Sequence, residues 1–234
     1  MVQKISNSNN VDEIEESIKR TLQKEISGEV RFDEITREIY STDASIYRML
    51  PLCVVIPKNT NDVKNIVQIA DENNIPILPR GGGSSLSGQT VNRAIVIDFS
   101  KYLNTIIDFD KQNKKVVVQP GISIDVLNNY LKPMNLLFTP DPSTTNRATV
   151  GGVIGNNSCG AHSVIYGKTI DHVSSLETIL SNGDTHRFEK LSFNKFENLL
   201  NKDSLESRIY SNSLNLFKEY TDEIEKRFPK IQRR

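Results

Sequence analysis

Two glycine-rich stretches, residues 79–90 and 140–167, constrain the fold of this chain more than any other feature. Glycine has no Cβ, so it adopts positive φ readily and lets a ligand come close to bare backbone N–H groups. Consecutive N–H groups arranged as a concave nest bind anions. Two such stretches on one chain predict an extended, phosphate-containing ligand that is gripped at two places, and a dinucleotide cofactor fits that description.

Composition excludes several other classes of function. Lys plus Arg and Asp plus Glu both number 29 in 234 residues, so charge indicates neither a nucleic acid nor a membrane surface as partner. No apolar run approaches the ~20 residues of a membrane span, and the N-terminus lacks an export signal. Cys53 and Cys159 are the only cysteines, which fits a cytoplasmic location and is too few for an iron–sulfur cluster. The three histidines lack metal-site spacing, so no metal site is predicted.

The first hundred residues alternate between helix and strand patterns. Ile18 and Leu22 lie at helical spacing with Val11 and Ile14, and Asn10 with Glu13 forms a capping pair, so we expect a helix over 10–26. We expect strands at 53–57 and 75–78 on either side of a helix at 60–73. This order is a βαβ unit whose second strand runs straight into the first glycine-rich stretch.

Later residues favour an α+β class. We expect strands at 94–99, 105–109 and 115–119, with a hairpin loop at 110–114. Ser123 is placed to cap a helix that carries Val126, Leu127, Tyr130 and Leu131. Strands at 173–180 and 185–188 flank Asn182-Gly183, a typical two-residue hairpin loop. A helix is expected over 205–228, with one apolar stripe formed by Ile209, Leu216, Phe217, Tyr220, Ile224 and Phe228.

The common nucleotide signatures do not match. The Rossmann pattern G-x-G-x-x-G fails in the first stretch, because Leu86 or Ser85 stands where glycine is required. Residues 83–90 have Walker A spacing, but Gln89 replaces the lysine that contacts phosphate. Gly167-Lys168-Thr169 supplies the other end of such a loop, with His162 in place of its first glycine. A P-loop-like nucleotide hydrolase is therefore a disfavoured alternative.

One family does resemble these residues. The run 79–90, Asp98, Gln119-Pro120-Gly121 and the run 140–167 resemble the FAD-binding domain of the vanillyl-alcohol oxidase/PCMH flavoproteins. Residues 42–45 and 160–169 resemble its large D-2-hydroxyacid dehydrogenases, which join a flavin half to an iron–sulfur half. The resemblance implies an α+β, PCMH-type FAD-binding fold of two subdomains clasping FAD. We expect a helical lead-in over 1–49, an FAD-binding domain over 50–190 with subdomains at about 50–100 and 101–190, and a helical segment over 191–234 that begins a missing cap region.

The resemblance assigns the FAD diphosphate to the first glycine-rich stretch and places the ribityl chain, diphosphate and ring along the second, with Val173 near the adenine end. Arg80 is expected to bond either loop carbonyls or phosphate. His162 is expected to be structural, and a place near the flavin is the alternative. Ser84 stands where covalent members have a histidine, so a noncovalent FAD is expected, and Cys159 is discounted as an attachment site. The implied cofactor-binding residues are Arg80, Gly81, Gly82, Gly83, Ser84, Ser85, Gly88, Gln89, Pro140, Asp141, Pro142, Ser143, Thr149, Val150, Gly151, Gly152, Gly155, Asn156, Asn157, Ser158, Gly160, Ser163, Tyr166, Gly167 and Val173.

The implied activity is oxidation of a D-2-hydroxyacid (D-lactate, glycolate or D-2-hydroxyglutarate) to the 2-oxoacid, with hydride transfer to the flavin. The implied partners are the 2-hydroxyacid, an electron acceptor and an iron–sulfur half outside this chain, in the cytoplasm or peripherally at a membrane. No residue matches the family's carboxylate-binding arginine or catalytic base, so the catalytic residues stay unassigned. The chain is therefore expected to be an incomplete enzyme, and a noncatalytic flavin-binding fragment is the alternative.

Overall fold

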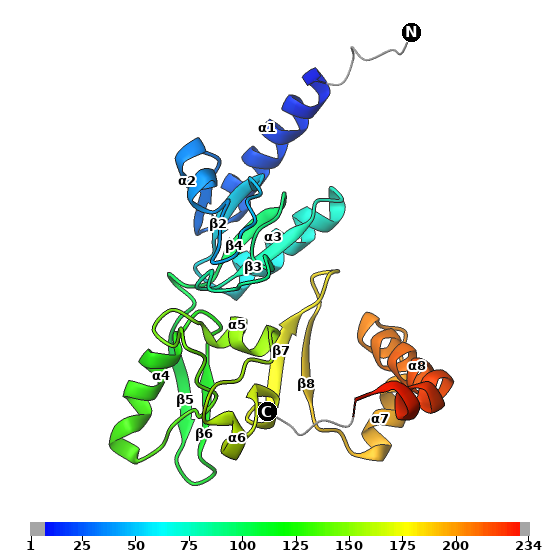
Figure 1. Cartoon of the computed structure of the whole chain (residues 1–234). Helices are drawn as coiled ribbons and strands as arrows, with labels where there is room; N and C mark the ends of the chain where they lie inside the picture. The colour runs from blue at the N-terminus through cyan, green and yellow to red at the C-terminus, as the bar shows by residue number, and fades with distance from the viewer. Residues whose placement is uncertain (1–7, 230–234) are drawn as a thin grey trace.

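A four-stranded sheet organises the N-terminal part of the chain (Figure 1). The computed structural model describes residues 8–229, with side chains from Glu16 onward. The strand order is β1-β2-β4-β3, in which β1 is antiparallel to β2 and the other three strands are parallel. The strands are β1 (Glu29–Arg31), β2 (Cys53–Ile56), β3 (Ile77–Arg80) and β4 (Ile95–Asp98).

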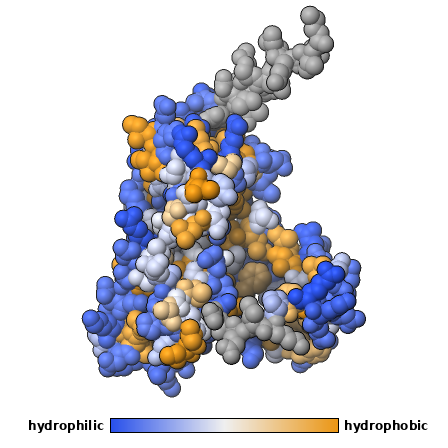
Figure 2. All heavy atoms as spheres, in the orientation of Figure 1, coloured by the Kyte–Doolittle hydropathy of each residue, from blue (hydrophilic) through white to orange (hydrophobic). Residues whose placement is uncertain are grey.

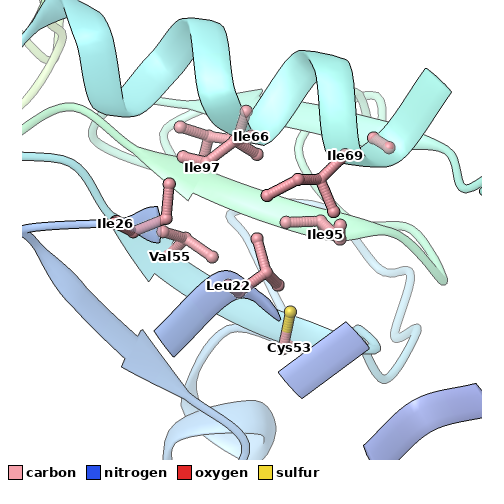
Figure 3. Close-up of a cluster of buried hydrophobic side chains, with 9 residues drawn as sticks. Leu22, Ile26, Cys53, Val55, Ile66, Ile69, Ile95 and Ile97 are labelled. Atoms are coloured by element: carbon pink, nitrogen blue, oxygen red, sulfur yellow. The ribbon is translucent and has the colours of Figure 1, made fainter. Parts of the chain in front are cut away.

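Helices α1 (Ser8–Glu25) and α3 (Thr60–Glu72) supply the side chains that cover one face of this sheet. Figure 3 shows Ile66 and Ile69 of α3 over the strand residues Ile95 and Ile97, with Leu22 of α1 beside them. Val54, Ile56 and Val96 face the other way and pack against partly buried Tyr40, Leu78 and Tyr102. Burial on both faces explains why β2 and β4 are continuous apolar runs.

The predicted helix at 60–73 and strand at 53–57 are confirmed, with Asn59 as the helix cap. The strand predicted at 75–78 starts later, because Asn74 is left-handed at φ 52° and the Ile75 N–H bonds the carbonyl of Ala70. This pairing is a Schellman cap, which uses those residues to end α3. The βαβ unit also has β4 inserted between its two strands. The side chains of the predicted capping pair, Asn10 and Glu13, lie outside the described residues.

A second core forms between the β5–β6 hairpin and two short helices. The hairpin strands and the capped helix that follows them are confirmed, with Ser123 accepting from the Val126 N–H. Leu127 and Leu131 are buried against Val150 and Val153, whereas Val126 and Tyr130 of the same helix are exposed. The elements are β5 (Ile106–Asp110), β6 (Lys115–Val118), α4 (Ile124–Leu131), the 3-10 turn η1 (Lys132–Met134) and α5 (Val150–Gly155).

The remaining elements form a hairpin and a helical end. The predicted two-residue loop at Asn182-Gly183 is wrong by one residue, because the Leu180 N–H bonds the Asp184 carbonyl and leaves a three-residue loop with Gly183 at φ 83°. The predicted final helix is confirmed, but its apolar stripe is mostly exposed, and α7 lies within the predicted helical segment without having been given bounds of its own. These elements are α6 (Ser163–Tyr166), η2 (Thr169–Asp171), β7 (Ser175–Ile179), β8 (Thr185–Glu189), α7 (Phe193–Leu200) and α8 (Leu205–Arg227).

Helix α2 (Glu34–Ile39) presents an apolar surface next to the first sheet. Ile35 and Ile39 are exposed there, and Figure 2 shows hydrophobic side chains gathered over this part of the molecule. None of the helices within residues 8–229 combines the length and the hydropathy needed to cross a bilayer.

Candidate functional site

The two glycine-rich stretches, far apart in sequence, lie against each other in the fold. A Cβ built on Gly81 would lie 2.0 Å from the Thr149 hydroxyl oxygen, and one built on Gly82 would lie 2.1 Å from the Arg147 carbonyl oxygen. Gln89 also donates from Nε2 to the Asn156 side-chain oxygen at 3.3 Å. Bare glycine is therefore required where the stretches meet, and one ligand can be held by both.

The first stretch (residues 80–90, called the first loop below) presents open backbone donors. Gly83 has φ 61° and Gly88 has φ 76°, values that glycine adopts more readily than residues with a Cβ. Within the described part of the chain, the N–H groups of residues 82–85 donate to no protein acceptor. The Ser85 hydroxyl donates to the Gln89 side chain in this structure, and its assignment as a cofactor contact stays a prediction. Four successive open donors are the donor set that an anion such as a diphosphate requires.

The Arg80 side chain stabilises the first loop by hydrogen bonds to backbone carbonyls. Its Nη1 donates to the carbonyls of Tyr40 at 3.1 Å and Thr90 at 3.0 Å, and its Nη2 donates to Thr42 at 2.8 Å. The guanidinium also lies 5.1 Å from the centre of the Tyr40 ring, within cation–π range. Burial lowers the pKa of Arg80 from its ordinary value. Of the two expected roles for Arg80, the structure supports the one with loop carbonyls.

A neighbouring segment, residues 40–48, closes around the same loop. The Ala44 N–H donates to the Gly83 carbonyl at 3.1 Å, and the Asp43 carboxylate accepts from the Thr90 hydroxyl at 2.8 Å. Burial raises the pKa of Asp43, but the hydrogen bonds from Ser45 and Thr90 outweigh it and lower the pKa overall. Sequence reasoning missed this role. The local sequence signal is Asp43 two residues before Ser45, a spacing typical of a turn in which the aspartate accepts from the backbone N–H of Ser45.

Tyr40 ties segment 40–48 to the sheet, because its hydroxyl donates to the buried Asp98 carboxylate at the end of β4. Burial and this bond raise the pKa of Tyr40 above its ordinary value. The other oxygen of Asp98 accepts from the Ser100 N–H at 2.7 Å. Asp98 therefore anchors the segment that holds Arg80, in addition to capping the turn after its strand.

The second stretch begins as helix α5, and its first N–H groups are already used. The Val150 N–H bonds the Ile122 carbonyl at 2.9 Å, and the Gly151 N–H bonds the Pro120 carbonyl at 2.8 Å. The Gly152 N–H bonds the side chain of its cap, Thr149. The start of α5 therefore offers no open anion nest, since residues 120 and 122 and the cap Thr149 consume these three donors. The assignment of these residues as cofactor contacts stays a prediction.

Helix α5 instead offers a bare surface. Gly152 and Gly155 are both exposed, and a Cβ built on Gly155 would meet nothing within 4 Å. By contrast, a Cβ on Gly151 would lie 2.8 Å from the Pro120 Cβ. The glycines of this helix thus serve two purposes: Gly151 permits close packing inside, and the other two leave room outside for a flat group.

The end of the second stretch folds back on Asp141. Its carboxylate lies 2.5 Å from Nδ1 of His162 and accepts from the His162 N–H at 3.1 Å. Burial raises the pKa of Asp141, but the bonds from His162 outweigh it and lower the pKa. A Cβ on Gly160 would lie 1.9 Å from the Asp141 carbonyl oxygen, so this contact too requires glycine.

Hydrogen bonds order the other predicted residues of the second stretch. Asn157 accepts from the Ile170 N–H at 3.0 Å, the Ser158 carbonyl accepts from the Thr169 hydroxyl at 2.7 Å, and the Gly160 N–H donates to the Ser163 hydroxyl at 3.1 Å. Pro140 is buried, Pro142 and Val173 are half-buried, and Ser143 and Tyr166 are exposed. Cys159 is exposed, and no group of histidine, cysteine or carboxylate residues within 8–229 could hold a metal ion.

Comparison with known proteins identifies this arrangement. A family model described as FAD binding domain matches residues 51–189, which include both glycine-rich stretches. The chain is 39% identical over 196 residues to a D-2-hydroxyglutarate dehydrogenase of Pantoea ananatis, a match that covers 82% of this chain and 19% of the relative. It is 38% identical over 169 residues to the glycolate oxidase subunit GlcD of Bacillus subtilis, covering 70% of this chain and 36% of that protein.

Solved structures agree on the fold. An alkyldihydroxyacetonephosphate synthase superposes with a TM-score of 0.66 at 23% identity, over 74% of this chain and 35% of that one. The Physcomitrella patens protein BBE-like 1 superposes with a TM-score of 0.64 at 21% identity, over 74% of this chain and 37% of that one. The predicted α+β, PCMH-type FAD-binding fold is confirmed. The chain spans about a fifth of the length of the D-2-hydroxyglutarate dehydrogenases that it matches.

Proposed function

Because this chain belongs to the family of FAD-binding domains, we propose that it is the flavin-binding part of an oxidoreductase that oxidises D-2-hydroxyacids to 2-oxoacids. The observation that carries the proposal is the junction of the two glycine-rich stretches, which lies within the matched residues and exposes open N–H donors beside a bare helix surface. FAD, when bound, supplies the hydride acceptor that such an oxidation needs. The residues of this chain bind and orient it.

Each part of the site then has a distinct task. The N–H groups of residues 82–85 bind the diphosphate, while Arg80 and the segment 40–48 hold the first loop in place for them. The bare surface at Gly152 and Gly155 lets a flat ring system approach α5. The proposal includes the cofactor-binding residues predicted from the sequence, among which Arg80 acts through the first loop, and the two subdomains at about 50–100 and 101–190.

The proposed substrate class follows from the relatives, whose names give D-2-hydroxyglutarate, glycolate and D-lactate as the compounds on which they act. An electron acceptor and an iron–sulfur half outside this chain, and a cytoplasmic location, are part of the same proposal. No described residue is assigned as catalytic base or as carboxylate-binding arginine.

We expect FAD to bind without a covalent bond. Ser84, which stands where covalent relatives carry a histidine, cannot attach to the flavin ring. Acid precipitation of the FAD-loaded protein should therefore leave the yellow flavin in the supernatant, and Cys159→Ser should behave in the same way. Yellow flavin in the precipitate would contradict the noncovalent assignment. If titration with FAD shows no saturable binding, the cofactor assignment itself fails.

We expect this 234-residue chain, loaded with FAD, to be reduced negligibly by D-2-hydroxyacids. Holding substrate against the flavin is worth up to ~7–11 kcal/mol of the barrier, and no residue within 8–229 is assigned to that task. The measurement is anaerobic bleaching of flavin absorbance by glycolate and by the D and L forms of lactate and 2-hydroxyglutarate. Rapid bleaching by D forms alone would place the substrate site inside this chain, and selective bleaching by L forms would refute the substrate class.

A further inference from the structure

The first loop offers N–H donors to a diphosphate, but its one arginine, Arg80, already binds backbone carbonyls. The Arg80 guanidinium donates to three backbone carbonyls, those of Tyr40, Thr42 and Thr90, from both of its terminal nitrogens. It lies beneath the loop and stacks on Tyr40, which leaves it little capacity for a phosphate. A diphosphate held by backbone donors alone keeps its negative charge largely uncompensated, so a second cation at this place would strengthen binding.

Arg147 is located where such a cation is needed. Its backbone packs directly on the first loop, since a Cβ built on Gly82 would lie 2.1 Å from the Arg147 carbonyl oxygen and 3.4 Å from the Arg147 Cβ. The residue is exposed, and its guanidinium makes no hydrogen bond, ion pair or ring contact with any other described residue. Gly82, whose N–H is open, is therefore in van der Waals contact with the residue that carries an unpaired guanidinium.

The position of Arg147 is fixed by its neighbours. The Arg147 N–H bonds the Thr144 carbonyl at 2.8 Å, and the Ala148 N–H bonds the same carbonyl at 2.7 Å. Ala148 and Thr149, the next residues, are buried and lead into α5. The backbone is thus anchored at Thr144 and α5 while the side chain remains at the surface, so the backbone of Arg147 is already in place beside the loop.

We propose that Arg147 binds the diphosphate of FAD together with the open N–H groups of residues 82–85. The proposal rests on the proposed function, because it concerns the cofactor of that same site. A guanidinium suits the task, since its planar fork of N–H donors matches phosphate oxygens in pairs and keeps its charge at any physiological pH. Arg80 and Arg147 then divide two tasks: Arg80 shapes the loop from below, and Arg147 neutralises the ligand.

The test compares a ligand that carries the diphosphate with one that lacks it. Dissociation constants of FAD and riboflavin are measured by quenching of flavin fluorescence for the wild type, Arg147→Gln, Arg147→Lys and the control Arg208→Gln. Arg208 is an exposed arginine on α8 without a described side-chain partner. We expect Arg147→Gln to weaken FAD about ten- to a hundredfold while riboflavin affinity is unchanged. Arg147→Lys should lie between, because it keeps the charge and loses the fork.

Added salt supplies a second measurement that does not require riboflavin to bind tightly. FAD binding by the wild type should weaken with ionic strength more steeply than binding by Arg147→Gln, since the variant lacks one charge at the site. Unchanged FAD affinity in a folded Arg147→Gln protein would overturn the inference about Arg147 but not the proposed function. An equal loss of affinity for FAD and riboflavin would do the same. Failure of the wild type to bind FAD would instead refute the proposed function, and the inference with it.

Discussion

Replacing Gly82 with alanine should weaken FAD binding about a hundredfold and lower the free energy of unfolding by about 1–3 kcal/mol. The added Cβ would lie 2.1 Å from the Arg147 carbonyl oxygen and 2.8 Å from the Arg147 carbonyl carbon. These are backbone atoms that cannot rotate away, so one of the two glycine-rich stretches has to move. Movement separates the open donors of the first loop from the second stretch, and several ligand contacts are lost together.

The matched control for the stability effect is Gly155→Ala, which makes the same chemical change in the other stretch. A Cβ at Gly155 meets nothing within 4 Å, so this variant should melt like the wild type. Thermal unfolding of both variants and FAD titration of Gly82→Ala against the wild type check the prediction. A Gly82→Ala protein with wild-type stability and FAD affinity would show that the contact between the stretches is not needed.

The reason for the glycine at position 82 differs from the one that the loop pattern suggests. Gly83 and Gly88 have positive φ, whereas Gly82 does not, so backbone conformation does not require glycine there. Contact with Arg147 does. A substitution at Gly83 would destabilise the loop through backbone strain, because φ 61° is strained for a residue with a Cβ.

Replacing Arg80 with glutamine should lower the free energy of unfolding by about 2–4 kcal/mol and weaken FAD binding in parallel. Three carbonyls would lose a charged donor at once, and two of them, Tyr40 and Thr42, belong to the segment that closes around the loop. For a chain of this size the melting temperature should fall by roughly 5–15 °C. Differential scanning calorimetry and FAD titration measure the two effects.

Arg93→Gln is the matched control, since Arg93 is exposed and has no described side-chain partner. Arg80→Lys should lower the free energy of unfolding nearly as much as Arg80→Gln, although it keeps the charge. One ammonium group cannot replace a guanidinium that reaches three carbonyls. Equal melting temperatures for Arg80→Gln and Arg93→Gln would contradict the role of Arg80 in shaping the loop. A loss of FAD affinity without any loss of stability would place Arg80 on the phosphate instead.

Much of the fold could be read from the sequence because its signals are local. Ser123 caps the helix that follows it, as predicted, and the helix predicted at 60–73 forms over Thr60–Glu72. The apolar runs at β2 and β4 became buried parallel strands. Errors occurred where two local motifs compete for the same residues, as at Asn74 and Ile75, where the end of α3 delays the start of β3.

The sequence by itself determined where the chain can come close to a ligand, because glycine acts through the absence of its own side chain. It could not determine which donors stay available, because that depends on acceptors supplied from elsewhere in the chain. The Arg80 guanidinium is used by carbonyls of Tyr40 and Thr42, and the first N–H groups of α5 are used by Pro120 and Ile122. Only the tertiary structure brings these groups together, and it thereby leaves the first loop, and not the start of α5, with open donors.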